Sequence, residues 1–379
     1  MKENWTYKKL GEACEIYQPQ TISTEMLVPD GEYLVYGANG IIGRYDKYNH
    51  IESEVLLTCR GATCGSINVS APYSWINGNA MVIHPIDDSV FCSRSFLVYL
   101  MKSIDYSLVI TGAAQPQITR QKLSPVKIAI PPIETQSRIV SELDLLQSII
   151  DKQKAQLKKL DNLAQAVFYD MFGDPVENEK GWEVKTIGEL VDKSKNSLKR
   201  GPFGGALKKE IFVNDGFLVY EQYHALNNDF TFGRYFITED KYHQMKEFKV
   251  EPDDILISCS GVNLGKLAIV PSGAKQGIMN QALLKLRLDQ NIMTNIMFVY
   301  IFSNENFKKK YFGDYRGCAI PNFPPMTEFK KFSFPVPPLS LQQSFAAKIE
   351  SIEKQKTAIT QSIAETQRLF DYTMDKYFG

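Results

Sequence analysis

The sequence predicts an α+β protein with two mixed α/β globular domains in tandem repeat. Each domain is followed by one long helix, and the two helices pair as an antiparallel coiled coil. Three observations support this class: a repeated helix-start motif, a period-seven series of apolar residues after each copy, and short apolar segments typical of strands before it. With 379 residues, of which 44% are hydrophobic, the chain is long enough for more than one core.

The helix-start motif is the clearest part of the repeat. The segment PPIETQSRIV, whose second residue is Pro132, returns as PPLSLQQSFA with Pro338 at the same place, an offset of 206 residues. The same offset still relates Gly173 to Gly379 about 40 residues later. An offset that persists without a gap predicts two copies of one helix.

Shorter segments upstream of each helix also correspond, at offsets that drift and therefore imply loop insertions. The pairs are WTYKKLGE with WEVKTIGE, DGEYLVYG with DGFLVYE, VLLTCRGATCGSINV with ILISCSGVNLGKLAI, and GAAQPQI with GCAIPNF. We therefore expect a first globular domain at residues 1–131, a helix at 132–173, a second globular domain at 174–338 and a second helix at 339–379.

Within each domain the sequence alternates short strands with helices. EYLVYG, EVLLTC and AMVIHP in the first half, and FLVYEQ, DILISCS and ALLKLRL in the second, are apolar segments bounded by Gly, Asn, Asp and Pro. Helical stretches such as SRSFLVYLMKSI and TNIMFVYIFSNENFKKKYF follow them. Each domain is therefore expected to be mixed, with a mostly antiparallel, bent sheet.

Each long helix has two interleaved apolar series of period seven, which is the pattern of a coiled-coil seam. Because helices of roughly 60 Å need a partner along their length, and because the copies match in register, we expect pairing within one chain; pairing between two chains is the alternative. The series are Ile139, Leu146, Leu160 and Val167 with Leu143, Ile150, Leu157, Ala164 and Met171, interrupted by Gln153, and Phe345, Ile352 and Ile359 with Ile349, Ile363, Phe370 and Tyr377.

Composition limits the classes of function. The chain has 43 basic and 43 acidic residues, whereas a DNA-binding protein that works alone usually has a basic excess. Its six cysteines include no CxxC pair, and its four histidines are scattered, so no metal-ligand spacing is present. No apolar run approaches the ~20 residues of a membrane span, and the first residues lack a signal-peptide core. These features predict a cytoplasmic protein with reduced thiols and no metal or cofactor.

The sequence also argues against catalysis. GPFGGALKK at 201–209 does not have the spacing of a dinucleotide- or phosphate-binding loop. PNFPPM at 321–326 has Phe323 between the asparagine and the two prolines, which interrupts the motif of amino-methyltransferases. Asp253 and Asp254 are adjacent, but the carboxylate and lysine pattern of a metal-dependent nuclease does not follow them. We therefore expect a non-enzymatic role.

The Trp-x-x-x-x-[Leu/Ile]-Gly-Glu openings, the Pro-Pro helix starts and the GAAQPQI and GCAIPNF segments resemble the DNA specificity subunit of type I restriction-modification enzymes. The resemblance extends over nearly the whole chain, including its duplication. It implies that each globular domain is a target recognition domain for one half of a bipartite, asymmetric DNA sequence. It also implies that the helix pair sets the spacing and docks two methyltransferase (modification) subunits, and that restriction subunits, which are ATP-dependent translocases and nucleases, join them. The chemistry would belong to those partners.

Loops that differ between the halves are the candidate DNA contacts; for example, Arg60 in the first half aligns with Ser260 in the second. Arginine can pair with guanine through two hydrogen bonds, amides suit adenine, and basic loops suit phosphates. For each candidate, a solvated charge or a hydrogen bond within a turn is the alternative. The candidates are Arg60, Lys266, Ser260, Lys199, Arg200, Lys208, Lys209, Gln115, Gln117, Asn322, Asn39 and Arg44.

A function of another class also fits part of the pattern. A coiled-coil scaffold with two protein-binding heads and no DNA role would explain the helices and the net charge of zero. Basic loops that differ between the halves favour DNA instead. A lone methyltransferase with tandem readers is disfavoured because the chain shows no cofactor-binding loop.

Overall fold

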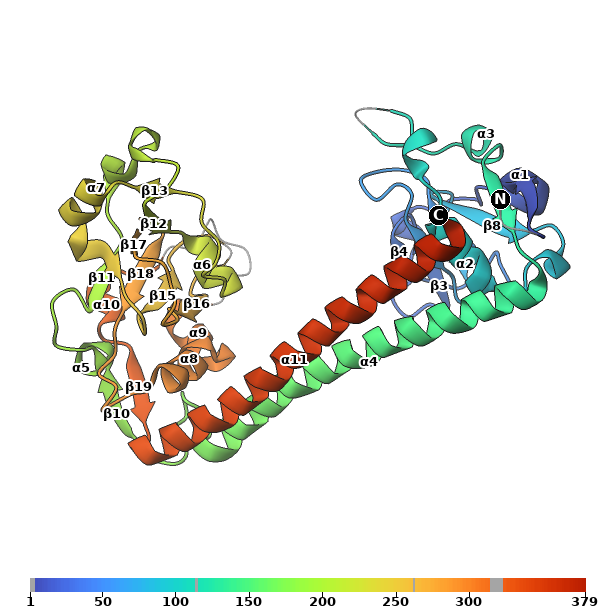
Figure 1. Cartoon of the computed structure of the whole chain (residues 1–379). Coiled ribbons are helices and arrows are strands. Elements are labelled where there is room, and N and C mark those ends of the chain that lie inside the picture. Colours follow the sequence, from blue (N-terminus) through green and yellow to red (C-terminus); the bar gives the residue numbers. More distant parts are fainter. Residues whose placement is uncertain (1–3, 113–114, 262, 314–322) are drawn as a thin grey trace. The chain divides into compact units, whose positions relative to one another are not determined.

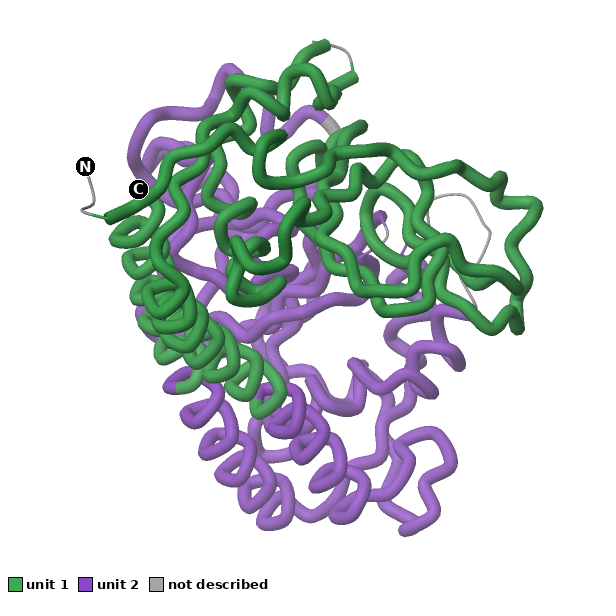
Figure 2. Tube along the Cα trace, turned by 90° about the vertical axis from the view of Figure 1, so that its right-hand side faces the viewer, with its two compact units in different colours: residues 1–156, 359–379 green, residues 157–358 purple. Residues whose placement is uncertain are grey.

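The computed structural model describes residues 4–112, 115–261, 263–313 and 323–379. They fall into two units, one formed by Met1–Gln156 with Ile359–Gly379 and the other by Leu157–Ala358. Figure 2 colours these units green and purple, and we call them unit 1 and unit 2. Each unit combines one globular part of the repeat with a portion of both long helices.

In unit 1, the described strands form three sheets. The two-stranded and four-stranded sheets are antiparallel, and the three-stranded sheet is mixed because β3 and β7 run parallel. In spatial order the strands are β1 (Thr6–Lys9) and β9 (Lys127–Ile130); β2 (Cys14–Tyr17), β8 (Ala80–Pro85), β5 (Val55–Thr58) and β6 (Ile67–Val69); and β4 (Gly40–Tyr45), β3 (Tyr33–Gly37) and β7 (Trp75–Ile76).

Helix α2 (Arg94–Lys102) packs against β5 and β6 of unit 1. It begins after Ser93, whose hydroxyl accepts a hydrogen bond from Phe96 N at 3.3 Å and so caps the helix. Phe96 and Leu97 are fully buried and join residues of β5 and β8 in one apolar core. The shorter segments of unit 1 are α1 (Leu10–Ala13), α3 (Arg120–Leu123) and the 3-10 turns η1 (Thr24–Met26), η2 (Asp88–Val90) and η3 (Tyr106–Leu108).

Unit 2 repeats this plan with additional helices. Its described strands again form a two-stranded antiparallel sheet, a four-stranded antiparallel sheet and a mixed sheet, in which β12 and β17 run parallel. In spatial order they are β10 (Glu183–Thr186) and β19 (Ser333–Val336); β11 (Leu198–Arg200), β18 (Leu283–Leu286), β15 (Ile255–Ser258) and β16 (Leu267–Ile269); and β13 (Phe236–Ile237), β12 (Phe217–Tyr220), β17 (Gly277–Met279) and β14 (Lys249–Val250).

The helical segments of unit 2 fall into counterparts of unit 1 and insertions. Helix α8 corresponds to α2, and Thr294 caps it as Ser93 caps α2. Helices α6 and α7 lie in the longer loop between β12 and β15. The segments are α5 (Ile187–Leu190), α6 (Gln222–Asn227), α7 (Glu239–Gln244), α8 (Asn295–Ser303), α9 (Glu305–Phe312), α10 (Met326–Phe329) and the turns η4 (Gly204–Leu207), η5 (Lys209–Ile211) and η6 (Lys246–Phe248).

The two four-stranded sheets have equivalent backbone hydrogen bonds at the ends of their central strands, β5 and β15. In unit 1, Thr58 N donates a hydrogen bond to Ser66 O at 2.8 Å, and in unit 2, Ser258 N donates to Lys266 O at 2.8 Å. β5 lies between β8 and β6 as β15 lies between β18 and β16. The structure therefore confirms the duplication that the sequence predicts.

The long helices are α4 (Ile133–Phe172) and α11 (Leu339–Phe378), which run side by side (Figure 1). In unit 1, Tyr377 near the end of α11 donates a hydrogen bond to Glu142 near the start of α4, at 2.8 Å. Gln153 lies further along α4 and donates to Ser362, which lies earlier in α11, at 2.8 Å. From one bonded pair to the next, the residue number increases in α4 and decreases in α11, so the helices are antiparallel. The predicted coiled coil within one chain is confirmed.

The predicted seam is the buried face of both helices. Ile139, Leu143 and Ile150 are at most 1% exposed and belong to the core of unit 1, which also includes Phe370 and Tyr377 from α11. The portion of the seam in unit 2 is similarly apolar. There Ala164, Phe345 and Ile349 of the predicted series are buried. Phe168, which the series did not include, is buried as well, whereas the predicted Val167 and Met171 are only half-buried. Burial of this apolar surface is what stabilises the helix pair.

A buried glutamine fixes the start of each long helix to its own unit. Gln136 Nε2 donates to Val90 O and Pro131 O, both at 2.9 Å, and its Oε1 accepts from Cys92 N at 2.9 Å. Gln342 makes the same three bonds in unit 2, to Ile292 O, Pro337 O and Thr294 N, at 3.0, 2.8 and 2.9 Å. Both side chains are fully buried.

Candidate nucleic-acid interface

The candidate residue Arg60 of unit 1 lies directly after β5, opposite the segment that contains Gln117. Ile118 N donates to Cys59 O and Gly61 N donates to Pro116 O, both at 3.0 Å. These two bonds place Arg60 and Gln117 opposite each other in an antiparallel bridge. Two of the candidates, 57 positions apart in the sequence, are therefore neighbours.

Other segments meet at the same end of β5. The hydroxyl of Thr58 donates to Ala38 O, which brings the turn with the exposed Asn39 beside the strand end. Gln18 Nε2 donates to Gly78 O at 2.8 Å and to Cys59 Sγ at 3.2 Å. The arrangement is a polar loop surface held by backbone and amide hydrogen bonds, and the exposed Gln115 belongs to the same segment as Gln117.

Arg44 does not join this group. It lies at the opposite end of the β3–β4 hairpin from Asn39, paired with Leu34. Its Nε donates to Gly31 O at 2.5 Å and its Nη2 to Glu32 O at 2.8 Å. The guanidinium therefore stabilises the hairpin through backbone carbonyls.

Unit 2 has the same backbone at this position but different side chains. Phe323 N donates to Cys259 O at 3.3 Å, the counterpart of the bond from Ile118 to Cys59. Ser260 is held by Gln222 of α6, whose Nε2 donates to Ser260 O at 2.9 Å and to its Oγ at 3.0 Å. The candidate Asn322 lies outside the described residues.

Lys266 is exposed at the start of β16, and a second lysine lies near it. Burial lowers the pKa of Lys308, and the positive charge of Lys266 lowers it further. The carboxylate of Glu305 partly opposes this lowering.

The basic segment around β11 divides into residues held by the fold and exposed residues. Lys199 pairs with Glu247 at 2.6 Å and lies over the Phe248 ring at 5.1 Å from its centre. Lys208 and Lys209 are exposed. Gly201 sits where a Cβ atom would meet Asn280 O at 1.8 Å, so the close approach of β11 to this loop requires glycine.

Arg200 lies near the end of β15. Burial raises the pKa of the Cys259 thiol to about 12, and the charge of Arg200 opposes that rise. Arg200 itself is half-buried and pairs with Leu284 of β18. Leu284 also pairs with Ile257 near the end of β15, so Arg200 lies across β18 from that strand end.

Sequence reasoning missed Thr111, Gln18 and Gln222, which hold the candidate loops in place. Thr111 exchanges two backbone hydrogen bonds of 2.8 Å with Gln117. No sequence pattern marks these residues, because each is recognisable only from the partner that the fold brings to it. Within the described part of the chain, no group of three or more His, Cys, Asp or Glu residues could hold a metal ion.

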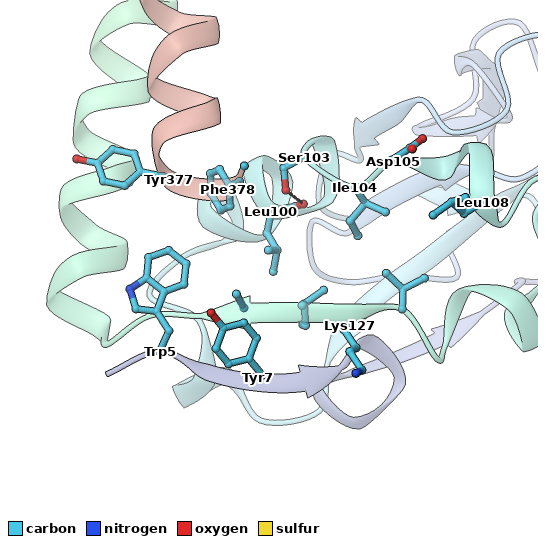
Figure 3. A pocket seen from close by; sticks show the side chains of 14 residues that line it. Trp5, Tyr7, Leu100, Ser103, Ile104, Asp105, Leu108, Lys127, Tyr377 and Phe378 are labelled. Carbon is cyan, nitrogen blue, oxygen red and sulfur yellow. Dashed lines mark hydrogen bonds between the residues drawn. The ribbon is translucent and has the colours of Figure 1, made fainter. Parts of the chain in front are cut away.

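A cavity of about 740 Å³ lies elsewhere in unit 1, beside β1, β9 and the end of α11. Figure 3 shows Trp5, Tyr7 and Phe378 around it. None of the candidate DNA contacts lines this cavity, which belongs to the junction between the helix end and the small sheet. In the part of the chain that the structure describes, no helix is long and apolar enough to cross a membrane.

Known proteins resemble the chain over different shares of its length. A protein of Haemophilus influenzae described as a type I restriction enzyme specificity subunit is 22% identical over 365 residues, covering 90% of this chain and 86% of the relative. The EcoprrI specificity subunit of Escherichia coli is 24% identical over 146 residues, or 38% of this chain and 36% of that protein.

Solved structures share the fold. The S subunit of a type I restriction-modification system from M. genitalium aligns with a TM-score of 0.62 and 16% identity, covering 99% of this chain and 96% of that one. A chain from a study of assembly and conformational transition in the type I system aligns with a TM-score of 0.57 and 17% identity, covering 99% and 98%.

The match to a family model covers both halves of the repeat. The model for the type I restriction modification DNA specificity domain matches residues 2–162 and again residues 179–366. These two matches span most of the 379 residues. The chain therefore belongs to the family of type I restriction-modification DNA specificity proteins.

Proposed function

We propose that this chain is the DNA-recognition subunit of a type I restriction-modification complex and has no catalytic activity of its own. Each globular domain reads one half of a bipartite, asymmetric DNA target. One observation supports the asymmetry. Cys59 O and Cys259 O accept equivalent backbone hydrogen bonds in the two units, but the next residue is Arg60 in unit 1 and Ser260, bonded to Gln222, in unit 2. Identical readers would imply a symmetric target; different side chains imply two different half-sites.

In this proposal residues 1–131 and 174–338 are the target recognition domains, and residues 132–173 and 339–379 are the spacer. A stiff helix pair sets the number of unread base pairs between the half-sites, at ~3.4 Å per base pair. The helices also dock two methyltransferase subunits, and restriction subunits join that complex. Those partner subunits catalyse methyl transfer from S-adenosylmethionine and ATP-driven DNA cleavage. The complex acts in the cytoplasm.

Eight of the candidate contacts divide into two groups of four. Arg60, Gln115, Gln117 and Asn39 present polar groups from one end of the sheet in unit 1, which suits contacts to base edges. In unit 2 the basic residues Arg200, Lys208, Lys209 and Lys266 suit phosphate contacts. Arg44 and Lys199 already bind groups of the protein and support the loops instead. Zero net charge fits a reader whose partners supply further phosphate contacts.

The alternative of a coiled-coil scaffold without a DNA role is not favoured, because the family of this chain is one of DNA specificity proteins. The test is reconstitution of the chain with the methyltransferase subunit from its own system, followed by sequencing of the methylated positions in genomic DNA. We expect one split, asymmetric motif. A continuous motif, or methylation equal to that of the methyltransferase alone, would contradict the proposal.

A further inference from the structure

Three polar side chains of unit 1 lie in a row on one face of a short ladder. Arg60 and Gln117 form the bridge in which the flanking bonds are Gly61 N to Pro116 O and Ile118 N to Cys59 O. This is the narrow type of antiparallel pair, in which the two side chains are closest and point to the same face.

Thr111 extends the ladder on the other side of Gln117. The two residues exchange both backbone hydrogen bonds, at 2.8 Å each, so their side chains also share a face. The hydroxyl of Thr111 donates to Gln117 O at 3.2 Å. The backbone of Gln117 is thus bonded to Thr111 on one side, and on the other side its neighbours Pro116 and Ile118 are bonded to Gly61 and Cys59. Arg60, Gln117 and Thr111 therefore follow one another across the ladder.

The opposite face of the ladder is buried, so the side chains of Arg60, Gln117 and Thr111 lie on its outer face. Cys59 is 0% exposed and Ile118 is 1% exposed, and both belong to the core of unit 1. Because side chains alternate along extended backbone, their neighbours Arg60 and Gln117 must point outward. The exposed Arg60 forms no side-chain hydrogen bond or ion pair with another described residue. Its five donors are therefore available to a ligand.

We propose that Arg60 and Gln117 form a two-residue reading element for adjacent base pairs in the major groove, with guanine at Arg60 and adenine at Gln117. This inference rests on the proposed function. Arginine donates two hydrogen bonds to guanine O6 and N7, and glutamine pairs with adenine N6 and N7. In a narrow pair the two Cα atoms lie about 4.5 Å apart, so two long side chains can reach base pairs that are stacked ~3.4 Å apart. Thr111 is a positioning residue that holds the Gln117 backbone.

The element is specific to unit 1. At the equivalent position unit 2 has Ser260, whose hydroxyl and carbonyl both accept from Gln222. A serine held in this way offers no fork of donors to guanine. The half-site read by unit 1 should therefore contain a guanine next to an adenine. Unit 2 must recognise its own half-site through other side chains.

The test uses the complete complex with its methyltransferase and a set of duplexes that differ from the mapped motif at single base pairs. In the wild-type complex, a duplex with the wrong base pair at either position should be methylated roughly 5- to 150-fold more slowly than the mapped motif. Arg60→Ala and Gln117→Ala should each remove this difference at one base pair. The two affected positions should be adjacent and in one half-site. Gln117→Glu, of the same shape, should move the preference toward cytosine, whose N4 donates to a carboxylate.

Matched controls lie on α3 of the same unit, where Arg120 and Gln121 are exposed. Arg120→Ala and Gln121→Ala should leave the discrimination at every position unchanged. Equal loss of rate on all duplexes for Arg60→Ala would show a phosphate contact and overturn the inference, as would affected positions that are not adjacent. If the wild-type complex itself gave no split motif, the proposed function would fail instead.

Discussion

Glu54 accepts a hydrogen bond from Nδ1 of His84 at 3.0 Å, and Arg94 reaches the same carboxylate at 3.3 Å. Glu54 is only 4% exposed. At the equivalent position in unit 2, Asp254 pairs with Arg287 Nε at 2.8 Å. The repeat therefore preserves a buried carboxylate just before the central strand, which unit 1 pairs with His84 and Arg94 and unit 2 pairs with Arg287.

We expect Glu54→Gln to change how the stability of unit 1 depends on pH. Burial raises the pKa of the Glu54 carboxyl above its ordinary 4.5, and the hydrogen bond from His84 only partly opposes this. A carboxyl with a raised pKa stabilises the folded state at acid pH, and that contribution is lost as the pH rises through the folded pKa. Wild-type Tm should therefore fall relative to that of Glu54→Gln as the pH rises above the ordinary 4.5.

Glu52→Gln is the comparison for this experiment, because Glu52 pairs with the same Arg94 at 2.5 Å from a side chain that is 66% exposed. The charge of Glu52 is one of the smaller causes that raise the pKa of Glu54, so Glu52→Gln should weaken the pH dependence of the Tm without abolishing it. A Tm difference between wild type and Glu54→Gln that does not change with pH would mean that His84 and Arg94 fully compensate the burial of the carboxylate.

The buried glutamines at the helix starts should be costly to replace. In Gln342→Leu, Thr294 N, Ile292 O and Pro337 O lose their partner, and each unpaired buried group costs about 1–3 kcal/mol. We expect destabilisation of at least about 3 kcal/mol, measured by urea unfolding. Gln136→Leu should have a similar effect on unit 1.

The neighbouring Gln343 is exposed and serves as the control for Gln342. Gln343→Leu should change the free energy of unfolding by less than about 0.5 kcal/mol. If Gln342→Leu proved as mild as this control, the hydrogen bonds at the helix start would not be what holds the helix to the domain.

The polar interruption of the seam should be removable with a gain in stability. Gln153 Nε2 bonds to Ser362, but its buried Oε1 has no hydrogen-bond partner among the residues that the structure describes. An unpaired buried oxygen is unfavourable, and methionine has nearly the same shape as glutamine. Gln153→Met with Ser362→Ala should raise the Tm of the helix pair, followed by circular dichroism, by about 2–4 °C. A lower Tm would indicate that the amide specifies the register instead.

The spacing role of the helices can be tested by lengthening both. Seven residues inserted after Gln153 and seven before Ser362, the hydrogen-bonded pair in unit 1, preserve the period of the seam. They add ~10.5 Å, or about three base pairs. The methylated motif should gain about three unread positions while both half-sites stay the same. An unchanged gap would show that the helices do not set the spacing.

The large-scale organisation could be predicted because its signals are periodic and lie close together in the sequence. The seam residues Leu143 and Ile150 are seven apart, and their burial follows directly from that spacing. The roles of individual loop residues could not be predicted in this way. Arg44 and Lys199 looked like free cations, yet their partners Gly31 and Glu247 are 13 and 48 residues away. Only the fold shows that these charges are already used.

The same limit applies to the candidates that the fold does bring together. GAAQPQI and CRGATCG are separate motifs in the sequence, and nothing in either indicates that Gln117 lies opposite Arg60. Ser260 resembled a free loop hydroxyl, because Gln222 lies in α6, part of a loop that is longer in unit 2 than in unit 1. Pairings across such distances depend on the register of the sheet, which short motifs do not encode.

Unit 1 is assembled from two separate parts of the chain, since Phe370 and Tyr377 of α11 complete a core built by residues before Gln156. Unit 2 is continuous in sequence and lies between them. During translation, the ribosome therefore delivers the whole of unit 2 before the last piece of unit 1 is synthesised. The domain that begins first is expected to reach its native state last, and the nascent chain must keep an open apolar surface on unit 1 until its final helix emerges.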